Sequence, residues 1–425
     1  MKILFIVPGS GDSFYCGNCF RDNLQATALR KAGHEVIIMP LYLPLRHRTF
    51  QADTPLFFPA TTFYAAQKLF PGRHMPNWLK RLTASEGLLN MASSLSGSTS
   101  AEGMEQMTLA MITGEDTAFQ DMVKQLIDWV KERERPDVIH LSSSLLIAIA
   151  KEIKQAVDLP IVCSLQDEEV WLDGLKANYA AEAWQGIVAN SRYVDALLTT
   201  SHFYQSLITE RLPQLKAVKV IYPGVERAKY RCDSYPEQPT IGFFYRMNEA
   251  DGLDILVDAF VLLKQQGTIP GLRLRIGGGF TATDKPFLKQ MRQRLAPYAT
   301  DVVIEESYKM EEHARFYQQI SLLSVPLRFE EGVGLYLCEA FAAGRPVVEP
   351  ATGSFPEIVG EAGVLYSPNE PTELAAALAQ LLTDPQRMAQ CRAEALHLSE
   401  SRYSEVALAQ QLEQLYLSLT NKESN

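Results

Sequence analysis

Two carboxylates, Glu331 and Glu339, stand eight residues apart in one glycine-rich stretch of the chain. Gly332 and Gly334 follow the first of them, and residues 335–343 form an apolar run that predicts a buried helix. A glycine turn that feeds a helix N-terminus presents backbone N–H groups and the positive end of the helix dipole, which favour a phosphate. Since about two helical turns separate the carboxylates, both can face one ligand. The stretch therefore predicts a site for a ligand with a phosphate end and a hydroxyl-rich end. The alternative interpretation is an ordinary glycine-capped helix without a ligand.

The full string resembles the Glu-x7-Glu signature of retaining glycosyltransferases of the GT-B fold, family 4, with Glu331 and Glu339 at the two glutamate positions. The sequence from Ala343 to Val348, Ala-Gly-Arg-Pro-Val-Val, matches that family as well. The resemblance implies that Glu331 accepts hydrogen bonds from sugar hydroxyls of a nucleotide-sugar donor and that Glu339 accepts them from the ribose. It also implies donor contacts from the turn itself, at Gly332, Val333, Gly334 and Leu335.

The composition indicates an ordinary soluble enzyme. The chain has 425 residues, 47% of them hydrophobic and 21% charged, which suits two or three domains. Its net charge of −10 argues against a nucleic acid as the main partner. No apolar run approaches the roughly 20 residues that span a bilayer, and the run at residues 1–7 is too short for a signal-peptide core. Six cysteines in so long a chain do not form a disulfide framework, so we expect a reducing compartment.

Both halves of the chain alternate short apolar runs, which predict buried strands, with helical patterns. The predicted strands lie at residues 2–7, 36–39, 136–140, 160–165, 194–201 and 218–221 and, in the second half, at 240–246, 272–276, 302–304 and 322–326. This alternation predicts an α/β protein with parallel sheets in two Rossmann-like domains. The spacing Gly-x-Gly-x-x-Gly is absent after the first strand, which disfavours a dinucleotide-dependent dehydrogenase.

The GT-B fold that the resemblance implies has two Rossmann-like domains facing across a cleft and a C-terminal helix that crosses back to the first domain. We assign residues 1–226 to an N-terminal, acceptor-side domain with a helical insertion around 44–120. Residues 240–400 are assigned to the nucleotide-sugar-binding domain and residues 403–420 to the crossover helix.

Polar residues follow two predicted strands of the N-terminal domain. Gln166 and Asp167 come directly after the strand at 160–165, at the carboxyl end where ligands of open α/β sheets bind. The family carries His-Asp there, and its His meets the donor sugar; Gln166 can hydrogen-bond a hydroxyl or a carbonyl but has no titratable proton. An acidic strand-end loop without a ligand is the alternative. The resemblance also implies donor contacts from the glycine-rich loop after the first strand, at Gly9, Ser10 and Gly11.

Arg246 ends a predicted strand, and Gly252 precedes the next helix. In the family an Arg is followed five residues later by a Lys, and the two cations hold the donor diphosphate. This chain has Asp251 at the Lys position, so an attraction to the diphosphate is lost and a repulsion is added. At about 5 Å and an effective dielectric near 20, each of these two interactions amounts to roughly 3 kcal/mol. Three accounts follow: Lys309 or Arg345 supplies the missing cation, Asp251 turns away from the cleft, or the protein has lost activity.

Two further segments carry less specific patterns. Cys16-Gly-Asn-Cys19 is a single Cys-x-x-Cys pair without the second pair or histidines that zinc usually requires, so we expect it to be structural or to shape the acceptor site. Residues 67–81 mix cations with Phe70 and Trp78. They form either a surface for a lipid head group or an anionic acceptor, or a helical insertion whose charges are solvated.

The sequence therefore predicts a retaining glycosyltransferase of the hexosyltransferase type (EC 2.4), which moves a sugar to a hydroxyl of a glycan or lipid-linked saccharide. We expect a UDP- or GDP-sugar as co-substrate, no other cofactor and no metal. We expect a cytoplasmic protein without a nucleic-acid partner, which residues 67–81 could bring to the inner face of the membrane. The catalytic candidates are Glu331, Arg246, Gln166 and Asp167. Further donor contacts, made largely by the backbone around the base, are expected at Tyr308, Lys309 and Met310.

Two other interpretations share the fold. One is a different reaction, that of a nucleotide-sugar epimerase or a phosphorylase, although a phosphorylase would need a lysine for pyridoxal phosphate and the sequence offers no cue for it. The other is a catalytically weak or inactive homologue that binds sugar nucleotides or acts as an interaction subunit, which Asp251 and Gln166 motivate.

Overall fold

A computed structural model gives the fold and describes residues 1–9, 17–42, 52–54, 104–232, 234–306 and 312–421, with the isolated positions 62, 65, 69, 74–76 and 79. The side chains of residues 17–19 and 133–134 lie outside this description. The chain divides into two compact units. Unit 1 comprises Met1–Thr200, Gln205–Ile221 and Ala409–Asn425, and unit 2 comprises Ser201–Tyr204 and Tyr222–Leu408.

Unit 1 is built on a parallel sheet whose described strands follow the order β2-β1-β3-β4-β5-β6. The strands are β1 (Lys2–Val7), β2 (Glu35–Pro40), β3 (Val138–Leu141), β4 (Ile161–Ser164), β5 (Ala196–Thr199) and β6 (Val218–Val220). The central strands are buried along their whole length, which explains why they appear in the sequence as continuous apolar runs. The order of the strands reverses between β1 and β3, so this sheet has its switch point there.

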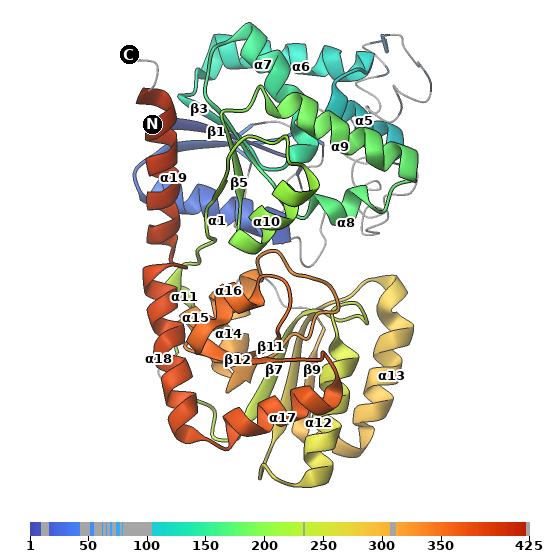
Figure 1. Ribbon diagram of the computed structural model, residues 1–425, viewed down its shortest axis with the longest axis vertical. Coiled ribbons are helices and arrows are strands. Elements are labelled where there is room, and N and C mark those ends of the chain that lie inside the picture. Colours follow the sequence, from blue (N-terminus) through green and yellow to red (C-terminus); the bar gives the residue numbers. More distant parts are fainter. Residues whose placement is uncertain are drawn as a thin grey trace. The chain divides into compact units, whose positions relative to one another are not determined.

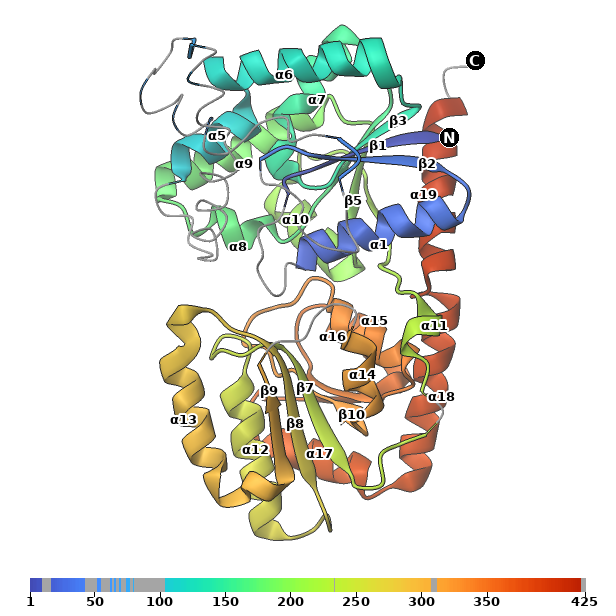
Figure 2. The same ribbon diagram turned by 180° about the vertical axis from the view of Figure 1, so that it is seen from behind.

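Helices cover both sides of the first sheet, and α1 lies on the opposite side of β1 from α6 and α7 (Figures 1 and 2). The helices are α1 (Gly17–Lys31), α5 (Glu105–Thr113), α6 (Thr117–Trp129), α7 (Ala148–Ala156), α8 (Glu168–Leu172), α9 (Ala177–Ser191) and α10 (His202–Arg211). The Asp116 carboxylate caps α6 by accepting hydrogen bonds from the N–H groups of Ala118 and Phe119. The predicted helical insertion around 44–120 lies mostly outside the described residues; α5 and the start of α6 are the helices of it that the structure describes in full sequence.

The C-terminal helix α19 (Glu405–Thr420) begins in unit 2 and belongs to unit 1 from Ala409 onward. Its Tyr416 hydroxyl lies 2.7 Å from Nδ1 of His140 on β3, and Nε2 of the same ring lies 2.8 Å from Ser164 Oγ on β4. Burial lowers the pKa of His140 to about 3, so the ring is neutral and both of its nitrogens have a partner. These contacts confirm that the last helix returns to the first unit.

Unit 2 repeats the architecture, with described strands in the order β12-β11-β10-β7-β8-β9. The strands are β7 (Thr240–Arg246), β8 (Arg273–Gly279), β9 (Val302–Glu305), β10 (Leu322–Leu323), β11 (Val347–Pro350) and β12 (Gly363–Tyr366). All pairings are parallel, and the order reverses between β7 and β10. Both sheets confirm the predicted α/β class with two Rossmann-like domains.

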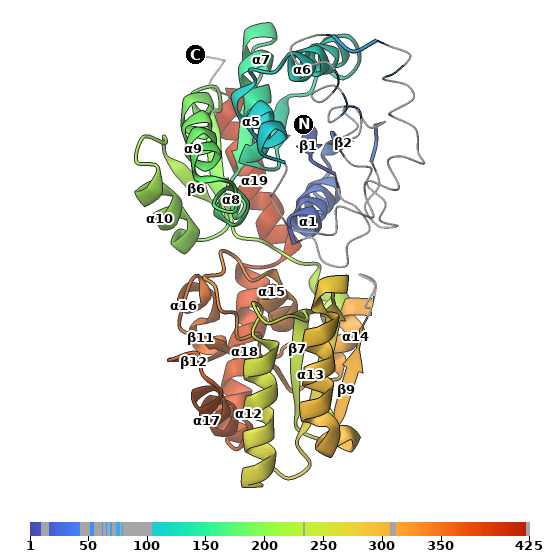
Figure 3. The same ribbon diagram turned by 90° about the vertical axis from the view of Figure 1, so that its right-hand side faces the viewer.

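Helices also cover the second sheet, and Figure 3 shows α12 beside α13. The helices are α11 (Arg227–Tyr230), α12 (Leu253–Gln266), α13 (Lys285–Leu295), α14 (His313–Gln318), α15 (Leu335–Ala342), α16 (Phe355–Val359), α17 (Pro371–Leu382) and α18 (Pro385–Ser401). The chain passes into unit 2 after Ile221, whereas the sequence analysis placed the end of the first domain at residue 226. Within the described residues, no helix has both the length and the apolar character needed to cross a membrane.

Candidate active site

The predicted donor-binding stretch lies at the switch point of unit 2. β7 ends at Arg246, and the chain that leaves the neighbouring strand β10 passes through Glu331 into α15. Gly334, with φ of 57°, stands at the N-cap of α15, and every residue of that helix is buried, as the apolar run predicts. Since ligands of open α/β sheets bind at such a switch point, the fold brings together the two stretches that the sequence singled out.

Glu331 is held in place by its own unit. The residue is 5% exposed; the N–H of Val333 donates to Oε1 at 3.1 Å, and the Tyr245 hydroxyl donates to Oε2 at 3.4 Å. Val333 was predicted to offer its N–H to the ligand, but in the structure this N–H serves the glutamate. A carboxylate that is oriented before the ligand arrives needs little reorganisation during a reaction.

Two glycines permit the close packing of the loops around Glu331. Gly353 has φ of 57°, and a Cβ at this position would lie 2.7 Å from the backbone nitrogen of Glu331. Gly252 has φ of 75°, and a Cβ there would lie 1.8 Å from the carbonyl oxygen of Pro326. Both positions need glycine for conformation and for space, so the loops that follow β7, β10 and β11 pack directly backbone to backbone.

Glu339 is enclosed by side chains of unit 2. The residue is 0% exposed; the hydroxyls of Tyr230 and Tyr317 donate to its two oxygens at 2.7 Å each, and His313 Nδ1 lies 3.2 Å from Oε1. The spacing of Glu331 and Glu339 predicted that both carboxylates face one ligand. In the structure the Glu339 carboxylate is directed into this enclosure, so a ribose contact would require one of these three partners to give way.

Arg246 is half-buried at the end of β7 and has protein partners. Its guanidinium bonds Asp284, with an Nη2–Oδ2 distance of 3.1 Å, and donates to Thr281 Oγ1 at 3.1 Å. Asp284 is in turn fixed by the Thr281 N–H at 2.7 Å. Backbone and side-chain hydrogen bonds from Thr281 and the charge of Arg246 lower the pKa of Asp284 despite its partial burial. The arginine is therefore oriented by an ionised carboxylate and keeps donor groups for a further anion.

Asp251 interacts electrostatically with these charged groups. It is buried, and its ionisation is favoured by Arg246 and opposed by Glu331 and Asp284; burial is the largest cause that raises its pKa to about 7. The charges of Arg246, Glu331 and Asp284 therefore act on Asp251. Arg345 is unsuited to replace the missing lysine, because it is fully buried and donates to the carbonyls of Tyr317 and Ser234. Lys309 lies outside the described residues.

The raised pKa of Asp251 predicts a stability that depends on pH. The unfolded carboxyl loses its proton near pH 4 and the folded one near pH 7, so the contribution of Asp251 to the free energy of unfolding falls by about 1.4 kcal/mol per pH unit between these values and is flat above them. Asp251→Asn removes this decline, and its stability relative to the wild type is expected to grow by a few kcal/mol from pH 4 to pH 7 in urea titrations.

The matched control for this prediction is Asp258→Asn. Asp258 is an aspartate of α12 whose partner is Arg294, and both side chains are partly exposed. Its substitution is expected to shift stability by less than about 1 kcal/mol at every pH. If the free energies of unfolding of the wild type and of Asp251→Asn changed in parallel between pH 4 and pH 7, the prediction would be contradicted.

In unit 1, Gln166 and Asp167 occupy the predicted position after β4. The backbone N–H of Gln166 donates to Glu168 Oε2 at 2.6 Å, and its Nε2 donates to Asp22 Oδ1 at 3.3 Å. Asp167 adopts a left-handed backbone with φ of 53°, and Glu168 also accepts from the Ser144 N–H at 3.2 Å. The turn is thus tied to the neighbouring strand end, and Gln166 is held by a carboxyl of α1.

Several predicted positions fall outside the described residues. They are Ser10, Gly11, Tyr308, Lys309, Met310, Cys16, the Cys19 side chain and most of residues 67–81. Gly9 is described; it follows β1 with φ of 92°, at the switch point of the first sheet.

The structure also shows the partners of two carboxyls, Glu349 and Glu357, that are not among the predicted site residues. Glu349 is a fully buried carboxyl at the end of β11 that accepts from the Val325 N–H; burial and the charge of Glu331 raise its pKa. Glu357 accepts from the N–H groups of His202 and Phe203 and from the Tyr222 hydroxyl at 2.7 to 3.0 Å. Glu357 thus caps the start of α10, and only the fold shows this role because its partners are distant in sequence.

Two family models match the chain. Residues 238–384 match "Glycosyl transferases group 1", and residues 23–224 match "Glycosyl transferase 4-like domain". Glycogen synthase of Mycobacterium tuberculosis is 30% identical over 276 residues, which cover 61% of this chain and 63% of that protein. D-inositol 3-phosphate glycosyltransferase of Corynebacterium aurimucosum is 30% identical over 197 residues, 45% of this chain and 46% of that one. The chain thus spans less than two thirds of the length of these relatives.

Solved structures match along almost the whole chain. Sucrose-phosphate synthase from Thermosynechococcus elongatus superposes with a TM-score of 0.69 at 17% identity, covering 99% of this chain and 100% of that one. Anabaena Alr3699/HepE in complex with UDP and glucose superposes with a TM-score of 0.65 at 18% identity and the same coverage. At these identities the likeness concerns the fold, and it agrees with the two family models on the two halves of the chain.

Proposed function

Since the chain belongs to the GT-B glycosyltransferases, we propose that it transfers a sugar from a nucleoside-diphosphate sugar to a hydroxyl acceptor, with retention of the anomeric configuration. The observation that carries this proposal is the placement of Glu331 and Arg246 at the switch point of unit 2. Each is oriented by its own unit, one by a backbone N–H and the other by an aspartate.

These residues match the charge changes of the proposed reaction. As the bond between the anomeric carbon and the phosphate oxygen breaks, negative charge grows on the diphosphate and positive charge on the sugar ring. Arg246 and the N-terminus of α15 would stabilise the diphosphate. Glu331 would accept from sugar hydroxyls and favour the oxocarbenium-like ring. The leaving diphosphate needs no proton, so no carboxyl is assigned the acid role that glycosidases require.

The relatives and the site support a choice of donor and acceptor for the proposed reaction. We favour a UDP-sugar, because the Alr3699/HepE structure contains UDP and glucose. The acceptor side is assigned to unit 1, where Gln166 and Asp167 stand at a strand end. Glycogen synthase acts, by its name, on a glucan, and D-inositol 3-phosphate glycosyltransferase on a cyclitol phosphate, so both acceptor classes belong in a test.

Calorimetric titration of the full chain with UDP and with GDP tests the donor assignment. One site with a dissociation constant in the micromolar range is expected for one of the two nucleotides, and weaker binding for the other. If neither nucleotide produces heat at millimolar concentration, the proposed donor site is wrong.

A further inference from the structure

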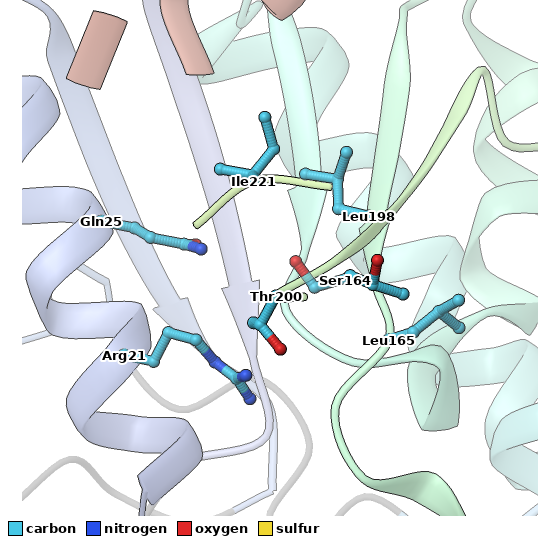
Figure 4. Close-up of a pocket in the computed structure, with 8 residues that line it drawn as sticks. Arg21, Gln25, Ser164, Leu165, Leu198, Thr200 and Ile221 are labelled. Carbon is cyan, nitrogen blue, oxygen red and sulfur yellow. The ribbon is translucent and has the colours of Figure 1, made fainter. Parts of the chain in front are cut away.

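A small pocket with polar and apolar walls lies in unit 1 between α1 and the carboxyl ends of β4 and β5 (Figure 4). Arg21 and Gln25 extend into it from α1, while Ser164, Thr200 and Ile221 line it from the strand ends. The space admits about one water-sized group. Thr200 and Ile221 are also the residues after which the chain leaves unit 1, so the pocket adjoins the carboxyl edge of the sheet, where ligands bind.

Gln25 has an amide oxygen that no group of the described structure satisfies. The residue is 4% exposed, and its Oε1 has no hydrogen-bond partner. A buried acceptor without a donor is destabilising, and such groups in native proteins usually mark a site for a water, an ion or a ligand. The pocket therefore requires an occupant that donates a hydrogen bond to Gln25.

The charges around the pocket favour an uncharged occupant. Burial raises the pKa of Asp22 to about 7 and also raises that of Asp167, and the charge of the buried Arg21 partly opposes both shifts. Both carboxyls interact with the guanidinium, so an anionic occupant such as phosphate would compete with them for its charge. Ser164 Oγ is bonded to His140, whose ring is neutral, so this wall adds no charge.

A hydroxyl group meets all these conditions. It can donate to Gln25 Oε1 and accept from a hydroxyl or guanidinium of the lining, and it has the size of the space. The pocket is also linked to the predicted acceptor residue Gln166, because Gln166 Nε2 donates to Asp22, one helical turn before Gln25 on α1. We infer that this pocket binds one non-reacting hydroxyl of an uncharged polyol acceptor and that Gln25 selects for it. This inference rests on the proposed transferase function.

Gln25→Met tests the inference, because methionine keeps the size of the side chain and removes the amide. The control is Asn190→Leu, which also removes a buried amide of unit 1; Asn190 Nδ2 donates to the carbonyl of Ile112 at 2.6 Å and has a purely structural partner. Both variants of the full chain are compared with the wild type by thermal unfolding without substrates. Transfer from UDP-glucose, and in the wild type also from UDP-galactose, UDP-N-acetylglucosamine and GDP-mannose, to maltotriose, myo-inositol and D-myo-inositol 3-phosphate is then measured.

The inference predicts that Gln25→Met leaves the unfolding midpoint unchanged or raises it, since no occupant is lost in the absence of acceptor, whereas Asn190→Leu lowers it. The KM for the uncharged acceptors is expected to rise about tenfold in Gln25→Met, with a change of less than twofold in the KM for UDP-glucose. A lower midpoint with unchanged acceptor KM would mean a structural water and overturn the inference. A rise in KM confined to D-myo-inositol 3-phosphate would assign the pocket to phosphate and overturn it as well.

The two measurements, thermal unfolding and sugar transfer, separate this inference from the proposed function. If the wild type releases no nucleotide from any donor, the transferase proposal fails whatever the midpoints show. If the wild type is active and Gln25→Met is destabilised to the same degree as Asn190→Leu, only the hydroxyl subsite fails.

Discussion

Glu331→Gln is expected to lower kcat about 10²–10³-fold, because the amide cannot offset the positive charge that develops on the sugar ring. The substitution keeps the size of the side chain, and the Val333 N–H can still donate to the amide oxygen. We therefore expect the fold and the binding of the nucleotide to change little, so that the loss appears in kcat and not in KM. Steady-state kinetics with the nucleotide sugar measure both.

Glu330→Gln is the matched control for this prediction. Glu330 directly precedes Glu331 in the chain but is exposed, whereas Glu331 is buried. Neutralising it is expected to change kcat by less than about threefold, because an exposed charge is screened by solvent. Equal losses in the two variants would show that general electrostatics of the loop, and not the position of one carboxylate, govern the rate.

Arg246→Met is expected to lower kcat/KM about 10³-fold, because it removes the described cation that the resemblance assigns to the donor diphosphate. The substitution also leaves the partly buried Asp284 without its ion-pair partner, so a moderate loss of stability is expected alongside the loss of activity. Unlike Glu331→Gln, it should weaken the binding of the nucleotide itself. Titration with UDP separates the two variants.

Arg275→Met controls for the loss of an arginine–carboxylate pair in the same sheet. Arg275 lies on β8, next to β7, and bonds Glu305 at 2.8 Å. Its loss is expected to lower stability by no more than about 1 kcal/mol and to leave UDP affinity unchanged. If UDP binds equally well to Arg246→Met and to Arg275→Met, Arg246 does not hold the diphosphate.

Much of the fold could be predicted from the sequence, because parallel strands buried on both faces must be apolar throughout. The runs at 2–7 and 322–326 identify strands for that reason, and glycines at positive φ, such as Gly334, identify where helices begin. Helix α9 was not predicted, although the strands before and after it, β4 and β5, were.

The site was predictable only in part, because the partners of its residues come from distant parts of the chain. The spacing of Glu331 and Glu339 is local, but the enclosure of Glu339 uses Tyr230 and Tyr317, which lie 109 and 22 residues away. The sequence placed an anion at Asp251, but its environment and its raised pKa depend on Arg246, Glu331 and burial. Gln25 gave no signal at all, since an unsatisfied amide exists only in the folded structure.

The proposal as a whole depends on cleavage of a nucleotide sugar by this chain. Proton NMR of the full chain with UDP-glucose, UDP-galactose, UDP-N-acetylglucosamine and GDP-mannose, each with the three acceptors, follows both the release of nucleotide and the anomeric signal of the product. The account predicts release from one donor, a product with the anomeric configuration of that donor, and loss of both signals in Glu331→Gln. No release from any donor, or a product of inverted configuration, would contradict it.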